Sequence, residues 1–180
     1  FPTRRSSDLV ETPDKSSMEF NFNGQSVIFS VKEFGIITGL KLRRSSNARP
    51  PPSTTRLIDT YFDGKRKIRN CDLREVFIGL RTKNLAEKDD LLKLCMLYFL
   101  ECGILGKESQ KGIKRDHFSM VEDLEYFNQY PWGLESFSML MESLHKAIKP
   151  DGGLNKSQTY TLQGLPLAFQ VCMLIYFNLY

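Results

Sequence analysis

Three residues in this sequence are of types that form a cysteine-protease triad. His145, Asp151 and Cys172 follow one another in the order found in papain-like and SUMO-specific proteases. A catalytic cysteine is expected to be exposed at a helix N-terminus, where the helix dipole stabilises the thiolate. Cys172 instead lies inside an apolar stretch, between Val171 and Met173. We therefore expect a structural thiol, no catalytic residue, and a protein that is not an enzyme.

A second group has side chains that bind metals. Cys95 and Cys102 are seven residues apart, on one face of a predicted helix, and His117 follows. A structural zinc site needs ligands paired at a spacing of two to four residues, together with a matched second pair. That zinc-binding pattern is missing. A phosphate-binding loop is also not indicated, because Gly152 and Gly153 lack the preceding strand and the following lysine of such a loop. The sequence predicts no metal and no cofactor.

A third group is basic. Residues 65–69 form a compact cationic turn next to two aromatic residues, and a proline-rich loop before it adds further arginines. Such clusters contact nucleic-acid phosphates or serve as nuclear-import signals, and a solvated turn is the plain alternative. The candidate contact residues are Arg43, Arg44, Arg49, Lys65, Arg66, Lys67 and Arg69.

Trp132 is the only tryptophan and follows Tyr130 and Pro131. Tryptophan is common among the residues that dominate binding at protein interfaces, so Trp132 is a candidate anchor for a partner. Packing of the predicted turn at residues 130–133 onto the core is the alternative.

Composition limits the class of protein. The 180 residues suit one domain, and with 41% hydrophobic residues the chain can bury a core. A net charge of +4 permits a nucleic-acid partner without requiring one. Four cysteines without the density of a secreted scaffold indicate reduced thiols in the nucleus or cytoplasm. We expect a protein partner first and nucleic acid second, with no membrane and no small-molecule substrate.

The segment that organises the predicted fold is residues 87–105. Acidic residues open it, and leucine, methionine, tyrosine and phenylalanine fill nearly its whole circumference. A helix that is apolar all round is buried in a core or a membrane, and this apolar run is far shorter than the roughly 20 residues that span a bilayer. We predict a buried central helix.

An N-terminal hairpin and a capped helix are predicted around it. Residues 18–22 and 25–29 flank Asn23-Gly24, which favours a two-residue hairpin turn. Ser30 and Glu33 have the spacing of a capping box, and Gly39 ends the helix at residues 31–38 because glycine tolerates a left-handed C-cap. Further helices are predicted at residues 55–62, 71–81 (capped by Asn70), 116–127 (capped by Asp116), 134–149 and 166–180. The fold class is mostly α with minor β, a single helical globular domain with an N-terminal hairpin.

The two ends of the chain differ in character from the rest. Residues 1–9 resemble the translation of a common sequencing adapter, so we expect an artefact there, followed by a linker at residues 10–17. The predicted domain covers residues 18–171. Residues 172–180 are expected to be a doubtful, truncated C-terminus of a fragment of a longer protein.

Several motifs together resemble a known plant family. They are Phe-Ser-Val-Lys-Glu-Phe-Gly-Ile-Ile-Thr-Gly-Leu at residues 29–40, Leu-Tyr-Phe-Leu at 97–100 with Asp-Leu-Glu at 123–125, Tyr-Pro-Trp-Gly-Leu-Glu-Ser-Phe at 130–137, and Leu-Gln-Gly-Leu-Pro-Leu-Ala-Phe-Gln at 162–170. In this order they are similar to the plant domain of unknown function 1985. The chain departs from the family after Gln170, where a tryptophan is expected rather than Cys172.

The resemblance implies a role as well as a fold. In that family the domain commonly precedes a SUMO-specific cysteine protease domain, in proteins derived from Mutator-like transposable elements. It therefore implies a non-catalytic interaction or scaffold module whose companion protease is absent here. A nucleic-acid-binding module acting through the basic loops is the alternative, and an inactive protease or pseudogene fragment is a second one.

Overall fold

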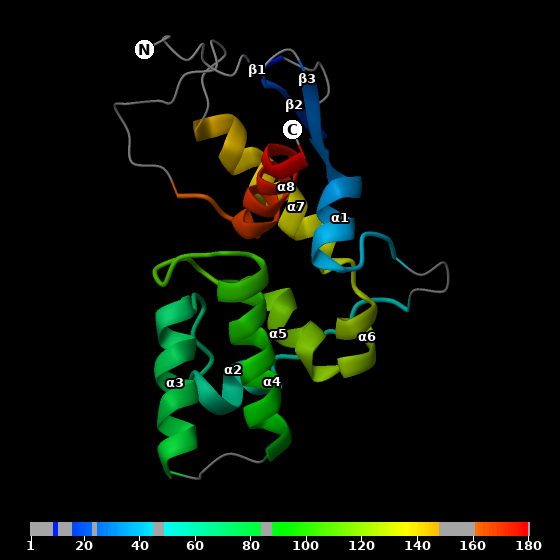
Figure 1. The fold of residues 1–180 in the computed structure, drawn as a ribbon. Helices are drawn as coiled ribbons and strands as arrows, with labels where there is room; N and C mark the ends of the chain where they lie inside the picture. Colours follow the sequence, from blue (N-terminus) through cyan, green and yellow to red (C-terminus); the bar gives the residue numbers. More distant parts are fainter. Residues whose placement is uncertain are drawn as a thin grey trace. The chain divides into compact units, whose positions relative to one another are not determined.

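A computed structural model describes residues 9–10, 16–22, 25–44, 49–83, 88–147 and 161–179 (Figure 1). The fold is mostly helical with a small antiparallel sheet, as predicted. The contacts between residues divide the chain into two compact units. Unit 1 contains the residues up to Leu42 and those from Trp132 onward, and unit 2 contains Arg43–Pro131.

The hairpin of unit 1 is confirmed. Strands β2 (Ser17–Phe22) and β3 (Gln25–Ser30) are antiparallel. Phe22 pairs with Gln25, so two residues connect the strands. Those residues, Asn23 and Gly24, lie outside the described part of the chain. A short strand β1 (Leu9–Val10) pairs with β2 as well, although the sequence suggested an artefact and a linker at those positions.

Helix α1 (Val31–Thr38) begins and ends where the sequence predicts. Ser30 and Glu33 form the expected capping box, in which the Ser30 backbone N–H donates to the Glu33 carboxylate at 3.0 Å. Gly39 ends the helix with a φ of 66° and donates its backbone N–H to the Gly35 carbonyl at 2.9 Å. Local signals within ten residues are sufficient to define this helix.

Two further helices complete the core of unit 1, α7 (Trp132–Ala147) and α8 (Pro166–Leu179). The predicted turn at residues 130–133 is wrong in its second half, because Trp132 already belongs to α7. Trp132 is only 6% exposed, which favours the packing interpretation over the exposed anchor. The buried side chains of this core are Met18, Phe20, Phe29, Phe34, Phe137, Leu140, Met141, Leu144, Ala168 and Cys172.

Gly133 allows the segment after α1 to lie directly against the start of α7. Its backbone N–H donates to the Lys41 carbonyl at 3.0 Å. A Cβ atom at this position would lie 2.8 Å from Leu40 Cβ and 2.8 Å from the Lys41 carbonyl oxygen. Backbone atoms cannot move aside as a flexible side chain does, so the position requires glycine.

We expect Gly133→Ala to lower the stability of the protein by about 1–3 kcal/mol, as overpacking of a tight contact does. Gly79→Ala is the matched control. Gly79 lies in a helix, and apart from its own helix backbone and adjacent residues no atom lies within 4 Å of an added Cβ, so alanine there should stabilise the helix by about 0.5–1 kcal/mol. Urea unfolding followed by circular dichroism measures both changes, and equal effects would contradict the proposed contact.

In the described residues of unit 2 the regular secondary structure is helical, with one isolated bridge between the loops. Its helices are α2 (Arg56–Tyr61), α3 (Asn70–Lys83), α4 (Lys88–Tyr98), α5 (Arg115–Glu122) and α6 (Leu124–Gln129), with a π-helical segment η1 (Phe99–Ile104) after α4 (Figure 1). The helix predicted at residues 116–127 is therefore broken in two. Asp123 causes the break, because its side chain accepts the Tyr126 backbone N–H at 2.9 Å and caps α6 instead.

The predicted central helix is also divided and is less buried than expected. Leu94, Leu97 and Leu100 are fully buried, in agreement with the prediction. Leu92 and Phe99, however, are 51% and 64% exposed. Helices α3 and α5 pack against α4 and leave one of its faces uncovered, so the expectation of burial all round was wrong. Apolar composition alone does not show how many neighbours a helix has.

An ionic network connects three helices of unit 2. The Arg56 guanidinium binds the Asp90 carboxylate of α4, with Nη1–Oδ2 at 2.9 Å, and the Glu122 carboxylate of α5, with Nε–Oε1 at 2.9 Å. Lys93 Nζ lies 2.9 Å from Glu122 Oε2. Hydrogen bonds and charge from Arg56 lower the pKa of Asp90 although burial opposes the effect. Two cations thus balance two carboxylates, and the network is structural.

No helix in the described ranges is long and apolar enough to cross a membrane.

Candidate nucleic-acid interface

The predicted basic turn lies beside a second segment that is distant in sequence. Arg69 and Gly112 form an antiparallel bridge. The Ile113 N–H donates to the Ile68 carbonyl at 2.8 Å, and the Asn70 N–H donates to the Lys111 carbonyl at 3.1 Å. The loop between η1 and α5 therefore runs along residues 65–70.

This pairing collects cations from both segments. The aliphatic chain of Lys67 lies over Gly112, with Cε 3.6 Å from the position of a Cβ there. Arg115 Nη1 donates to the Lys65 carbonyl at 3.2 Å, which leaves the guanidinium charge uncompensated. We call the resulting group the basic surface; its members are Lys65, Arg66, Lys67, Lys111 and Arg115. All five are exposed, and none forms an ion pair with the residues described in the structure.

Arg44 and Arg49, which the sequence also suggested as contacts, have partners within unit 2. Arg49 Nη2 lies 2.9 Å from Glu125 Oε2 and 3.3 Å from Asp123 Oδ2. Arg44 lies over the Tyr130 ring, 5.2 Å from its centroid. The ion pairs of Arg49 and the ring contact of Arg44 engage both guanidinium groups within the fold, so these arginines are less available to an external anion.

Arg69 has an ion-pair partner, whereas Arg43 has none among the described residues. Arg69 is paired with Asp72, with Nε–Oδ2 at 3.2 Å, and also donates to Gln110. Arg43 is exposed. The structure thus retains three of the seven predicted cations on the basic surface and adds Lys111 and Arg115. The sequence shows the second segment as a charged loop, but its pairing with the first is visible only in the fold.

A buried carboxylate holds this loop in place. Glu101 lies in η1 and is fully buried. Its Oε2 is 2.8 Å from Lys107 Nζ and its Oε1 is 2.5 Å from His117 Nδ1. Burial by itself raises the pKa of Glu101, but the hydrogen bonds and charges of His117 and Lys107 outweigh burial and lower it overall. Glu101 therefore remains ionised and fixes both ends of the loop.

Asn70 holds the same loop from the other side and does not act as the predicted N-cap. Its Nδ2 donates to the Lys107 carbonyl at 3.3 Å and to the Glu108 carbonyl at 3.0 Å. The Cys71 N–H donates to the Ser109 carbonyl at 2.8 Å. The loop carbonyls thus satisfy the first N–H groups of α3, so these groups are not free to bind an anion.

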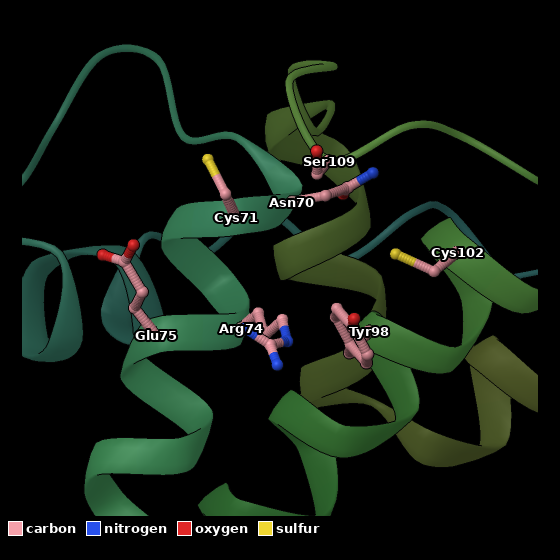
Figure 2. A pocket seen from close by; sticks show the side chains of 7 residues that line it. All are labelled: Asn70, Cys71, Arg74, Glu75, Tyr98, Cys102 and Ser109. Carbon is pink, nitrogen blue, oxygen red and sulfur yellow. The ribbon is translucent and has the colours of Figure 1, made fainter.

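A pocket of about 360 Å³ opens where this loop meets α3 and the junction of α4 with η1 (Figure 2). It is lined by Asn70, Cys71, Arg74, Glu75, Tyr98, Cys102 and Ser109. The Arg74 and Tyr98 side chains point toward one another between α3 and α4 in Figure 2. Burial and the neighbouring Cys102 raise the pKa of Tyr98, while Arg74 opposes that rise. Asn70 Oδ1 is the one buried side-chain polar atom without a hydrogen-bond partner among the described residues.

The residues considered for catalysis do not have the properties of a nucleophile and base. Cys172 is buried within α8, and burial raises the pKa of its thiol, which is the reverse of the change that activates a cysteine. His145 Nδ1 is 2.7 Å from the Met141 carbonyl oxygen of its own helix. Asp151 lies outside the described residues.

The three residues considered as metal ligands lie in different environments. Cys95 is exposed, Cys102 lines the pocket, and His117 is bound to Glu101. Within the residues that the structure describes, no group of three or more histidine, cysteine or acidic side chains is arranged to hold a metal ion.

Comparison with protein families decides the classification. Residues 7–143, more than half of the chain, match the family described as "Domain of unknown function (DUF1985)". The chain belongs to the DUF1985 family. No curated protein and no solved structure matches it.

The DUF1985 match covers the whole of unit 2, including the basic surface and the pocket. It begins earlier and ends earlier than the predicted span of residues 18–171. Helix α8 and the motif at residues 162–170 lie beyond it, and β1 lies within it. The adapter interpretation of residues 1–9 remains a prediction.

We expect Glu101→Gln to destabilise the DUF1985 domain by about 3–5 kcal/mol at pH 7, because it leaves Lys107 buried without its partner. The folded-state pKa of Glu101 is lowered, so its contribution is present above the ordinary value of 4.5 and is lost as the pH falls below it. Urea unfolding at pH 7 and at about pH 3.5 measures this difference.

The variant should lose less stability on acidification than the wild type does. Glu75→Gln, at an exposed carboxylate of α3, is the control and should leave both the stability and its pH dependence nearly unchanged. A Glu101→Gln protein as stable as the wild type at pH 7 would contradict the role assigned to this carboxylate.

Proposed function

We propose that this DUF1985 domain is a non-catalytic binding module that contacts nucleic-acid phosphates through the basic surface. The observation that carries the proposal is the antiparallel pairing of residues 65–70 with the loop before α5. It brings five exposed cations without ion-pair partners onto adjacent segments. Lysine and arginine side chains that neutralise phosphates release counterions, and this release supplies most of the non-specific affinity for nucleic acid.

The composition of the surface favours phosphates over an acidic protein. Three of its five members are lysines, namely Lys65, Lys67 and Lys111. Lysine is depleted in protein–protein interfaces, whose centres are enriched in aromatic residues and methionine. Lysine and arginine without a surrounding apolar centre are typical of contacts that position a nucleic-acid backbone.

A protein partner is the second candidate, and it is the one that the sequence favoured. The exposed side chains of Leu92 and Phe99 on α4 and η1 support it, because aromatic and apolar residues dominate binding energy at protein interfaces. The family resemblance adds the proposal that this partner belongs to a SUMO-specific protease system. Phe99→Asp should then weaken co-purification with such a partner and leave nucleic-acid binding unchanged.

The proposal that the module is non-catalytic is supported by the state of its thiols. Burial raises the pKa of both Cys172 and Cys102, so neither is prepared to act as a thiolate near neutral pH. Activity of this chain on a SUMO conjugate that disappears in Cys172→Ser would contradict it.

We expect charge reversal of Lys65, Arg66 and Lys67 to glutamate to weaken binding of nucleic acid and to flatten its salt dependence. Each phosphate contact contributes about one unit to the slope of log K against log salt, so the slope should fall by about 2 to 3. Fluorescence anisotropy with a labelled 20-nucleotide strand, titrated at several salt concentrations, measures affinity and slope together.

The matched control reverses Lys32, Lys41 and Arg43, which are exposed cations outside the basic surface. It changes the net charge by the same amount. The control should reduce affinity less than the surface variant does, because none of these three cations belongs to the paired segments that form the basic surface. Equal losses in the two triple variants would show that net charge matters and the basic surface does not.

A further inference from the structure

Two walls of the pocket in Figure 2 are formed by the same two segments that carry the basic surface. Asn70 and Cys71 directly follow Arg69, and Ser109 lies between Lys107 and Lys111 in the paired loop. The Cys71–Ser109 and Asn70–Lys111 hydrogen bonds join these walls. A strand whose phosphates follow the basic surface would therefore pass the mouth of the pocket.

The lining of the pocket suits a flat, unpaired ring. Tyr98 offers an aromatic side chain and Arg74 a planar guanidinium, and the two face one another. Proteins that bind single strands stack bases on aromatic side chains and on arginine guanidinium planes. Ligand pockets commonly hold about 300–1,000 Å³, so 360 Å³ is enough for one ring system and too little for a large cofactor.

Asn70 holds one wall of the pocket in a fixed position. Both hydrogens of its amide are directed to loop carbonyls, so its oxygen cannot exchange places with the nitrogen without losing two hydrogen bonds. That oxygen is buried and accepts no hydrogen bond from the described residues. Asn70 therefore fixes one wall of the pocket to the loop, and the recognition of a ring is left to Tyr98 and Arg74.

We propose that this pocket receives one unpaired nucleobase from a single strand held on the basic surface, stacked against Tyr98 and Arg74. The inference rests on the proposed nucleic-acid binding and assigns it a substrate class, single-stranded rather than duplex nucleic acid. The neighbouring phosphates bind the basic surface, and the base supplies the additional affinity.

The test uses the full chain and three labelled probes of equal length. One is a 10-nucleotide single strand, the second is the same strand with abasic sites at its four central positions, and the third is the duplex of the first. Because each stacked base adds substantially to affinity, we expect the intact strand to bind about tenfold more tightly than the abasic strand. The duplex should behave like the abasic strand.

Two single variants assign the difference to the pocket. Arg74 is exposed, so Arg74→Ala should leave the fold intact and reduce the preference for the intact strand to less than about threefold. Arg66→Ala, on the basic surface outside the pocket, should weaken all three probes equally and keep the preference. Circular dichroism confirms that each variant is folded.

The outcomes separate this inference from the function on which it rests. Equal affinity for intact and abasic strands would overturn the base pocket while leaving phosphate binding in place. A preference that persists unchanged in Arg74→Ala would also overturn it. If no probe binds at any salt concentration, the proposed nucleic-acid binding itself is wrong, and the base pocket is overturned with it.

Discussion

The arrangement of unit 2 depends on one buried carboxylate, Glu101. An ionised group without contact with water is costly unless charged partners compensate for the lost hydration. Lys107 and His117 provide that compensation at 2.8 and 2.5 Å. Both partners come from chain that follows η1, so satisfying Glu101 requires the chain to fold back over it. The loop between η1 and α5 has its position because the carboxylate inside it must be paired.

The π-helical segment makes this possible. In η1 the Leu105 N–H donates to the Leu100 carbonyl at 2.8 Å, one residue further along than in an α-helix. The Lys107 N–H then donates to the Glu101 carbonyl at 2.9 Å, which tightens the turn out of the helix. Segments of this kind are frequent at functional sites. Here the same turn directs the loop toward Asn70. The side-chain amide N–H groups of Asn70 donate to the loop carbonyls.

Carboxylate partners within the fold determine which lysine and arginine side chains remain free to bind a ligand. Arg56 is held between two carboxylates, and Arg49 by the acidic residues around α6. Lys67 and Lys111 have no such partners, because their segments pair through backbone groups and leave the side chains outside. Whether a cation is paired inside the fold or exposed to bind a ligand therefore depends on how its segment pairs through the backbone, and depends little on whether it is lysine or arginine. It also explains why a chain with a net charge of only +4 has a locally basic surface.

The sequence by itself determined the features that depend on neighbours along the chain. The β2–β3 hairpin, the capping box of α1 with its glycine stop, and the start of α8 at Pro166 were all predicted, because turn and cap preferences act within a few residues. The break at Asp123 is also local, because its side chain caps α6 three residues on, although the predicted helix ran through it. Tertiary structure alone decided the division into two units and the uncovered face of α4. Tertiary structure also decided the candidate site. The pairing of residue 69 with residue 112 and the burial of Glu101 both depend on contacts between segments that are far apart in the sequence, and no local pattern predicts such contacts.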